Sequence, residues 1–141
     1  MAAVEAEYSL LNRDLERELA PAAGALGIGL LAWSPLGRGV LTGKYRHGVP
    51  ADSRAASTHL SGFVAPYLNS AAAAVVEAVA TAASGLGVSP LDVALAWVRS
   101  RPLVASAILG ARTPAQLHTA LAGADLQLPD AIVQALGEVS G

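Results

Sequence analysis

Apolar residues form two kinds of pattern along the chain, short runs without helical spacing and longer segments with it. Three short runs, residues 2–8, 28–33 and 104–109, lack helical spacing and are predicted to be β-strands. The middle run is apolar at every position, which is typical of a strand that is covered on both faces of a parallel sheet. Parallel strands need long crossover connections, so helices are expected between them.

Helix signals stand where such connections are needed. Residues 13–26 follow Asn12 as a possible cap, place apolar side chains at 15, 19, 22, 23 and 26, and stop at Gly27. They predict one amphipathic helix whose Arg13 and acidic first turn face solvent. An Ala-rich helix is predicted over 70–84, and Ser89-Pro90 and Thr113-Pro114 each mark a further helix start. A last helix is expected over 130–138.

The predicted order of elements is strand, helix, strand, a long connection, two helices, strand, helix, helix. This alternation predicts an α/β fold, and 141 residues are enough for one domain, residues 1–141. The connection over residues 34–61 is rich in Gly, Pro and Arg. Loops of this length in a compact domain are usually functional or disordered.

Composition narrows the classes of function. The chain is 53% hydrophobic and only 14% charged, so much surface must be buried, within the fold or against something that the chain lacks. The net charge of −2 and the scattered cations argue against nucleic acid as a partner. No cysteine is present, and the three histidines lack ligand spacing, so no metal site is expected. Neither a secretory signal nor a bilayer span is seen, which predicts a cytoplasmic protein without membrane contact.

Candidate chemistry lies in the segments that follow the predicted strands, where parallel α/β proteins bind ligands. After the middle strand come Trp33, Ser34, a glycine-rich turn and Lys44. A flat ring, a hydroxyl group, bare backbone amides and a cation suit a dinucleotide. A core tryptophan followed by an ordinary turn is the alternative, because aromatic residues are large apolar side chains first.

The last predicted strand leads into a second candidate segment. Gly110 allows close approach, Arg112 supplies a charged fork, and the helix that starts at Thr113 presents unpaired N–H groups. These features suit a phosphate group. The alternative is a capped helix beside a solvated arginine.

Three runs together resemble the aldo-keto reductase family. They are Glu-Tyr-Ser-Leu-Leu-Asn-Arg at 7–13, the segment 32–45 with its Trp-Ser-Pro-Leu and Gly-Lys-Tyr, and Gly-Ala-Arg-Thr-Pro-Ala-Gln-Leu at 110–117. The resemblance implies an NADPH-dependent oxidoreductase that reduces aldehydes and ketones on a (β/α)₈ TIM barrel. The present chain would form the last three β/α units and the C-terminal helices.

The resemblance also implies roles for individual residues. Trp33 would stack on the nicotinamide, residues 34–38 would line the pyrophosphate, and the cations of the long connection would close over the cofactor. Residues after the last strand would hold the adenosine end and its 2′-phosphate. The implied NADP(H)-binding set is Trp33, Ser34, Pro35, Leu36, Gly37, Arg38, Lys44, Arg54, Gly110, Arg112 and Gln116.

The chain departs from the family pattern in three respects. Glu5 stands where members commonly have a glutamine for the nicotinamide carboxamide, and Thr119 and Ala120 replace an acidic residue and an asparagine near the adenine. The catalytic Asp, Tyr, Lys and His of the family belong to earlier strands and have no match here. Tyr8 and Lys44 match other positions of the motifs, so no catalytic residue is assigned.

Three hypotheses follow for function. The chain is part of an enzyme that acts on a carbonyl substrate once a complementing N-terminal portion completes the barrel. It is a module that binds NADP(H) without turnover and self-associates to bury its open side. It is an inactive fragment.

Overall fold

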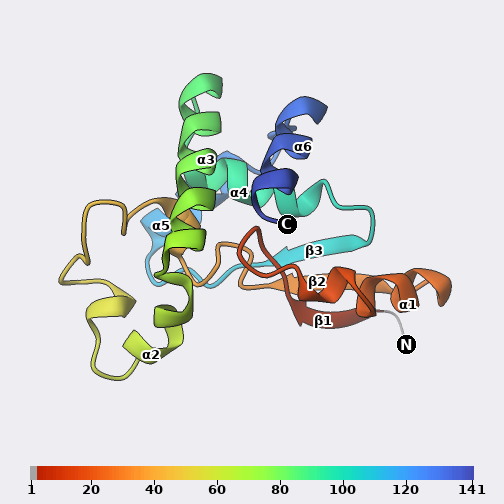
Figure 1. Ribbon diagram of the computed structural model, residues 1–141, viewed down its shortest axis with the longest axis horizontal. Coiled ribbons are helices and arrows are strands. Elements are labelled where there is room, and N and C mark those ends of the chain that lie inside the picture. The colour runs from red at the N-terminus through yellow and green to blue at the C-terminus, as the bar shows by residue number, and fades with distance from the viewer. Residues whose placement is uncertain (1–2) are drawn as a thin grey trace.

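The computed structural model describes residues 3–141, in which three parallel strands form one sheet with most of the helices on one side (Figure 1). The strands are β1 (Ala3–Glu7), β2 (Gly29–Trp33) and β3 (Val104–Ile108), and their order in the sheet is their order in the chain. All three predicted strands are confirmed. The predicted start of the first strand, at residue 2, lies outside the described residues.

Six helices connect or follow the strands. They are α1 (Leu19–Ala25), α2 (Ser61–Val64), α3 (Ser70–Leu86), α4 (Pro90–Arg99), α5 (Pro114–Ala122) and α6 (Asp130–Val139). Five of them stand in the predicted order, and the short α2 was not predicted. Short 3₁₀ helices add η1 (Asp14–Glu16), η2 (Val40–Thr42), η3 (Arg54–Ala56) and η4 (Ala65–Tyr67). The predicted starts are confirmed: the side chains of Asn69, Ser89 and Thr113 cap α3, α4 and α5.

The prediction of one helix over residues 13–26 was wrong. The segment divides into η1 and α1, and Leu26 at its end is 72% exposed. Pro21 explains the break, because it has no N–H to donate to the carbonyl four residues earlier and is tolerated only in a first helical turn. The helix therefore starts again at Leu19. Of the predicted apolar positions, only Leu15 in η1 and Ala23 in α1 are buried.

The main core lies between one face of the sheet and the helices α3, α4 and α6. Leu30 and Ala32 of β2 point into it, with Val4 and Ala6 of β1 packed beside them. Figure 1 shows these three helices on the same side of the strands. The largest buried side chain is that of Trp97 on α4, whose indole N–H donates to the carbonyl of Val133 on α6.

The opposite face of the sheet is not covered by residues 3–141 in the same way. Strand register aligns Glu5, Leu31 and Ser106 in one row and Glu7, Trp33 and Ile108 in the next. Leu31 and Trp33 are half-buried and Ile108 is 39% exposed. The prediction that the middle strand is covered on both faces was therefore wrong for this chain, because its own helices reach one face only.

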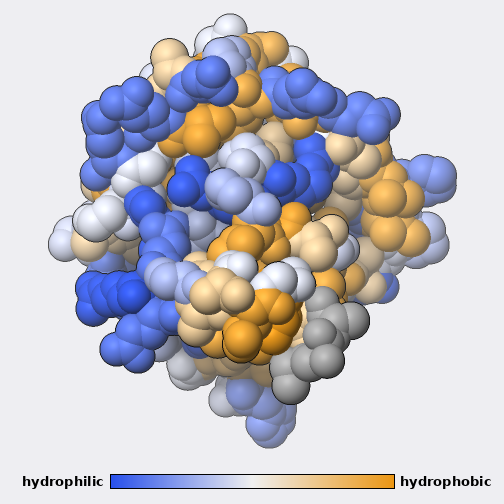
Figure 2. Space-filling view, turned by 90° about the vertical axis from the view of Figure 1, so that its right-hand side faces the viewer, coloured by the Kyte–Doolittle hydropathy of each residue, from blue (hydrophilic) through white to orange (hydrophobic). Residues whose placement is uncertain are grey.

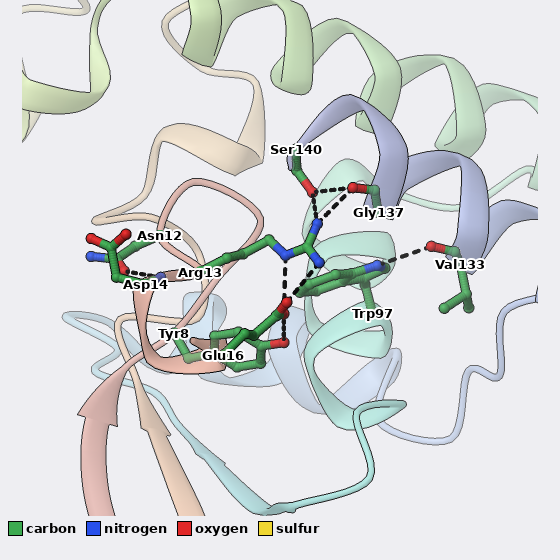
Figure 3. A network of polar contacts seen from close by, with 9 residues as sticks. All are labelled: Tyr8, Asn12, Arg13, Asp14, Glu16, Trp97, Val133, Gly137 and Ser140. Atoms are coloured by element: carbon green, nitrogen blue, oxygen red, sulfur yellow. Dashed lines mark hydrogen bonds and ion pairs between the residues drawn. The ribbon is translucent and has the colours of Figure 1, made fainter. Parts of the chain in front are cut away.

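A polar network fastens α6 to the segment after β1 (Figure 3). The Arg13 guanidinium donates to both carboxylate oxygens of Glu16, to the carbonyl of Gly137 at 2.6 Å and to the hydroxyl of Ser140. Glu16 also accepts a hydrogen bond from the hydroxyl of Tyr8. The prediction that Arg13 and Glu16 lie on a solvated helix face was wrong, because both are half-buried in this network.

Within residues 3–141, no single helix is long and apolar enough to cross a bilayer. The pair Ser61–Tyr67 and Ser70–Leu86 reaches that length together, but it is bent by 77°.

Candidate functional site

The carboxyl ends of all three strands meet at one edge of the sheet. Glu7, Trp33 and Ile108 are register partners, and the loops that contain the predicted site residues leave the sheet directly after them. Parallel strands place their ligand-binding loops at this edge. The sheet therefore brings the two main predicted segments, 33–45 and 110–116, to the same end of the molecule.

Trp33 ends the central strand on the open face of the sheet, where its side chain is half-buried. It is not a core tryptophan like Trp97, which is fully buried. Ser34, the next residue, has a left-handed φ of 53°, and its hydroxyl accepts a hydrogen bond from the amide of Arg38 at 2.9 Å. The chain thus turns sharply as it leaves the strand.

The turn that follows needs glycine for a steric reason. Gly37 has φ of 53°, and a Cβ there would lie 2.8 Å from Cδ1 of Leu11. The amides of Gly37, Gly39 and Val40 donate to carbonyls inside the turn. These three amides are therefore already paired, unlike the bare amides that the sequence suggested. Pro35 is buried and Leu36 packs against the core, so both hold the turn in place.

Arg38 is tightly engaged by residues from two other elements. Its guanidinium pairs with both carboxylate oxygens of Glu7, at 2.8 and 3.0 Å, and donates to the carbonyl of Phe63 at 2.6 Å. It also lies over the rings of Phe63 and Tyr67. Hydrogen bonding to Glu7 raises the pKa of Arg38 above its usual value. Arg38 therefore ties the turn to β1 and to the α2–η4 segment.

Tyr67 completes this cluster, and sequence reasoning missed it together with Glu7 and Phe63. The Tyr67 hydroxyl donates to Glu7 at 2.9 Å and accepts from the side-chain amide of Asn12 at 3.2 Å. Burial is the main cause that raises the pKa of Tyr67. The only sequence signal was an acidic residue at the end of an apolar strand, at position 7.

Lys44 and Arg54, two of the cations of the long connection, have no carboxylate within salt-bridge distance among residues 3–141. Lys44 is exposed, and its Nζ lies 3.3 Å from where a Cβ on Gly39 would be. Its ammonium group therefore rests against the glycine-rich turn. Arg54 is half-buried in η3, next to Ser53, whose buried hydroxyl has no hydrogen-bond partner.

The segment after β3 is exposed throughout. Gly110 has open space where a Cβ would be, and the Arg112 side chain lies in solvent with no ion pair among the described residues. The amide of Arg112 donates to the side-chain oxygen of Gln116 at 2.8 Å. Gln116 therefore orders the loop that carries Arg112, and Thr113 caps the helix behind it.

The three residues that depart from the family pattern lie in different parts of the structure. Glu5 is exposed on the open face, in register with Leu31. The hydroxyl of Thr119 bonds to the carbonyl of Ala115 within α5, and Ala120 is the one buried residue of that helix. Elsewhere in residues 3–141, no three His, Cys, Asp or Glu side chains come together as a metal site would need.

Sequence comparison identifies the family to which these features belong. The family model described as "Aldo/keto reductase family" matches residues 1–140. The chain belongs to the aldo/keto reductase family.

Three relatives illustrate the likeness. Protein tas of Escherichia coli is 40% identical over 131 residues, which are 92% of this chain and 37% of that protein. A probable voltage-gated potassium channel subunit beta of Oryza sativa is 42% identical over 113 residues, 79% of this chain and 34% of that protein. The uncharacterized oxidoreductase YrpG of Bacillus subtilis is 31% identical over 133 residues, 94% of this chain and 38% of that protein. The chain thus spans about a third of the length of these relatives.

Proposed function

We propose that this chain supplies the NADP(H)-binding part of an aldo/keto reductase that reduces aldehydes and ketones by hydride transfer. The observation that carries the proposal is that Trp33 and Ile108 are register partners, so that the segments with Lys44 and Arg112 leave the parallel sheet at the same edge. Aldo/keto reductases generally use NAD(P)H. The bound nicotinamide would supply the hydride, and the residues of this chain would hold the cofactor.

The residues present fit an elongated anion with one aromatic end. Trp33 offers a half-buried ring at the centre of the edge, whereas Lys44 and Arg112 offer charges that no carboxylate of residues 3–141 neutralises. Gly110 leaves room for close approach of a ligand. Arginine and lysine side chains bind phosphate groups strongly when they are not already paired.

Each residue would have a separate task. Trp33 would stack on the nicotinamide and Lys44 would neutralise the pyrophosphate beside the glycine-rich turn. Arg112, positioned by Gln116, would pair with the 2′-phosphate. Arg38 would act mainly by holding the turn against Glu7, because its guanidinium is already bonded to that carboxylate.

The open face of the sheet supports a barrel as the complete architecture. Leu31, Trp33 and Ile108 form an apolar surface that this chain leaves accessible, and β1 and β3 each have one edge that no strand of residues 3–141 pairs. We infer a (β/α)₈ barrel to which this single-domain chain contributes three strands. A further portion would cover the open face and provide the catalytic Asp, Tyr, Lys and His. A carbonyl substrate would bind only in that completed barrel.

A titration of the purified chain with NADPH tests the cofactor proposal. Excitation of the tryptophans should give saturable energy transfer to the nicotinamide. Lys44→Gln should weaken binding by about tenfold, because a charge-assisted contact is lost. Arg17→Gln removes an exposed cation of the segment between η1 and α1 and should leave the affinity unchanged. No saturable signal at millimolar NADPH, or equal effects of the two variants, would contradict the proposal.

A non-catalytic NADP(H)-binding module remains the second candidate, because no catalytic residue is assigned among the described residues. Mixing the chain with NADPH and a simple aromatic aldehyde should produce no loss of absorbance at the NADPH band. Turnover by the chain alone would show that its own residues suffice for reduction and would overturn the proposed division of labour.

A further inference from the structure

A second candidate site lies at the opposite end of the sheet from the carboxyl edge. A cavity of about 350 Å³ opens between α1, the first residues of β2 and β3, and the turn that joins α4 to β3. Figure 2 faces this side of the molecule and shows apolar side chains beside a hollow that is lined partly by hydrophilic ones. The cavity shares no residue with the predicted cofactor site, so it is independent of the proposed function.

The cavity exists because α1 presents small side chains to the sheet. Ala20, Pro21 and Gly24 line one wall, and Leu30, Leu103 and Val104 line the other. A Cβ on Gly24 would lie 3.6 Å from both terminal carbons of Leu103, which is ordinary contact distance. The hollow is open to solvent, and its mostly apolar walls offer contact to the apolar part of a guest molecule.

One end of the cavity carries a cation, Arg101, that forms no salt bridge with the described residues. Arg101 lines the cavity, and its guanidinium carbon lies 5.1 Å from the ring centroid of Trp97. No carboxylate of residues 3–141 lies within salt-bridge distance of Arg101. Stacking on an indole ring leaves the edge of a guanidinium group able to donate hydrogen bonds.

Glu16, the one acidic side chain of the cavity lining, lies near enough to Arg101 for that positive charge to help lower the Glu16 pKa, but its carboxylate is bonded to Arg13. Both of its carboxylate oxygens accept hydrogen bonds from Arg13, and one also accepts from Tyr8. Figure 3 shows the Glu16 carboxylate held by both Arg13 and the Tyr8 hydroxyl. The polar end of the cavity therefore keeps the positive charge of Arg101.

We propose that this cavity binds a small monocarboxylate with an apolar body. The carboxylate would pair with the Arg101 guanidinium, whose planar fork matches its geometry. The apolar body would lie between α1 and the side chains of Leu30, Leu103 and Val104. The volume is near the lower end of the range for ligand pockets, so a guest of about ten non-hydrogen atoms fits best.

Hexanoate is a suitable probe, with 1-hexanol and acetate as controls that each lack one half of the proposed ligand. In amide chemical-shift titrations of the ¹⁵N-labelled chain, hexanoate should shift Gly24, Leu103 and Val104 saturably. Hexanol and acetate should bind at least about tenfold more weakly, because each loses the charged or the apolar contact. Equal affinity for hexanoate and hexanol would overturn the role of Arg101.

Matched variants separate the charge from the space. Arg101→Gln should lower the affinity for hexanoate by about tenfold. Arg17 is an exposed cation outside the cavity, so Arg17→Gln should bind hexanoate within about twofold of wild type. Ala20→Leu should fill the cavity and abolish binding, whereas Ala22→Leu on the exposed side of α1 should keep it.

Amide dispersion of each variant establishes that it is folded. If Ala20→Leu does not fold, Gly24→Ala narrows the same cavity where contact distances allow a methyl group, and it should weaken hexanoate several-fold. The proposal is overturned if hexanoate gives no saturable shifts below about 10 mM, or if Arg101→Gln binds it as tightly as wild type.

Discussion

The cationic side chains of this protein have different roles, and the partners of each side chain explain the difference. Arg13 and Arg38 are each held by a bidentate carboxylate and join elements that are far apart in sequence. Lys44, Arg101 and Arg112 have no carboxylate partner among residues 3–141. The first pair therefore stabilises the fold, and the second group is available to ligands.

The Glu16 carboxyl makes stability depend on pH. Burial alone would raise its pKa, but hydrogen bonds from Arg13 and Tyr8 outweigh burial and hold the pKa below its ordinary value. In the unfolded chain this carboxyl takes up a proton at about pH 4.3, whereas in the folded chain it does so only at lower pH. The stabilisation is therefore lost as the pH falls from about 4.3 through the folded pKa. Between roughly pH 7 and roughly pH 3, the free energy of unfolding in urea should fall more steeply for wild type than for Glu16→Gln.

Glu18→Gln is the control for this prediction, because Glu18 is exposed and forms no ion pair with the described residues. Its pH profile should follow that of wild type. Parallel profiles for wild type and Glu16→Gln would show that the network does not hold the carboxylate in solution.

Replacement of glycine by alanine is expected to have opposite effects on stability at two positions. A Cβ on Gly123 would collide with the Asp92 carboxylate, which hydrogen bonds to Ser89 hold in place. Gly123→Ala should therefore lower the free energy of unfolding by about 1–3 kcal/mol. Gly85 lies in α3 with open space around it, so Gly85→Ala should raise that free energy by up to about 1 kcal/mol. Urea unfolding measures both, and a stabilised Gly123→Ala would contradict the geometry.

At the scale of single elements, α4 depends on its first turn. The Ser89 hydroxyl accepts from the amide of Asp92, and the Asp92 carboxylate accepts from the amide of Ser89, which makes a complete capping box. Ser89→Ala should cost about 1 kcal/mol of stability. Ser84→Ala on the exposed side of α3 should change stability by no more than about 0.5 kcal/mol. Equal thermal unfolding midpoints for the two variants would show that the cap contributes nothing.

Local patterns predicted these elements because the signals that define them are local. Short apolar runs predicted the three strands, and Ser89-Pro90 and Thr113-Pro114 predicted two helix starts. The helix predicted over residues 13–26 is not continuous, because Pro21 can stand only in a first helical turn and the apolar spacing does not reflect that restriction. The spacing of Leu19 and Leu26 predicted that both are buried, but the short helix leaves Leu19 partly exposed and Leu26 largely exposed.

Long-range pairing set the limit for the candidate site. The sequence indicated which residues follow the strands, and the sheet brings those segments to one edge. It could not indicate that Arg38 pairs with Glu7, 31 positions away, or that Arg13 reaches Gly137, 124 positions away. Such contacts depend on how elements pack, and no local pattern encodes them.

At the scale of the whole molecule, the sheet has one face packed against helices and one face left open. The high hydrophobic fraction of the sequence already required burial beyond a small core. The open row of Glu7, Trp33 and Ile108 lies beside the loops proposed to hold the cofactor. A completed barrel would thus cover the apolar face and close the cofactor site in the same step.

The selectivity between NADPH and NADH tests the cofactor site most directly. Arg112 is proposed to meet the 2′-phosphate that only NADPH carries, so Arg112→Ala should weaken NADPH by about tenfold or more and change NADH by no more than about twofold. Fluorescence titrations of both cofactors against wild type, Arg112→Ala and the control Arg17→Ala give the required ratios. Equal weakening of NADPH and NADH, or no change in either, would contradict the proposed placement of the cofactor along this edge of the sheet.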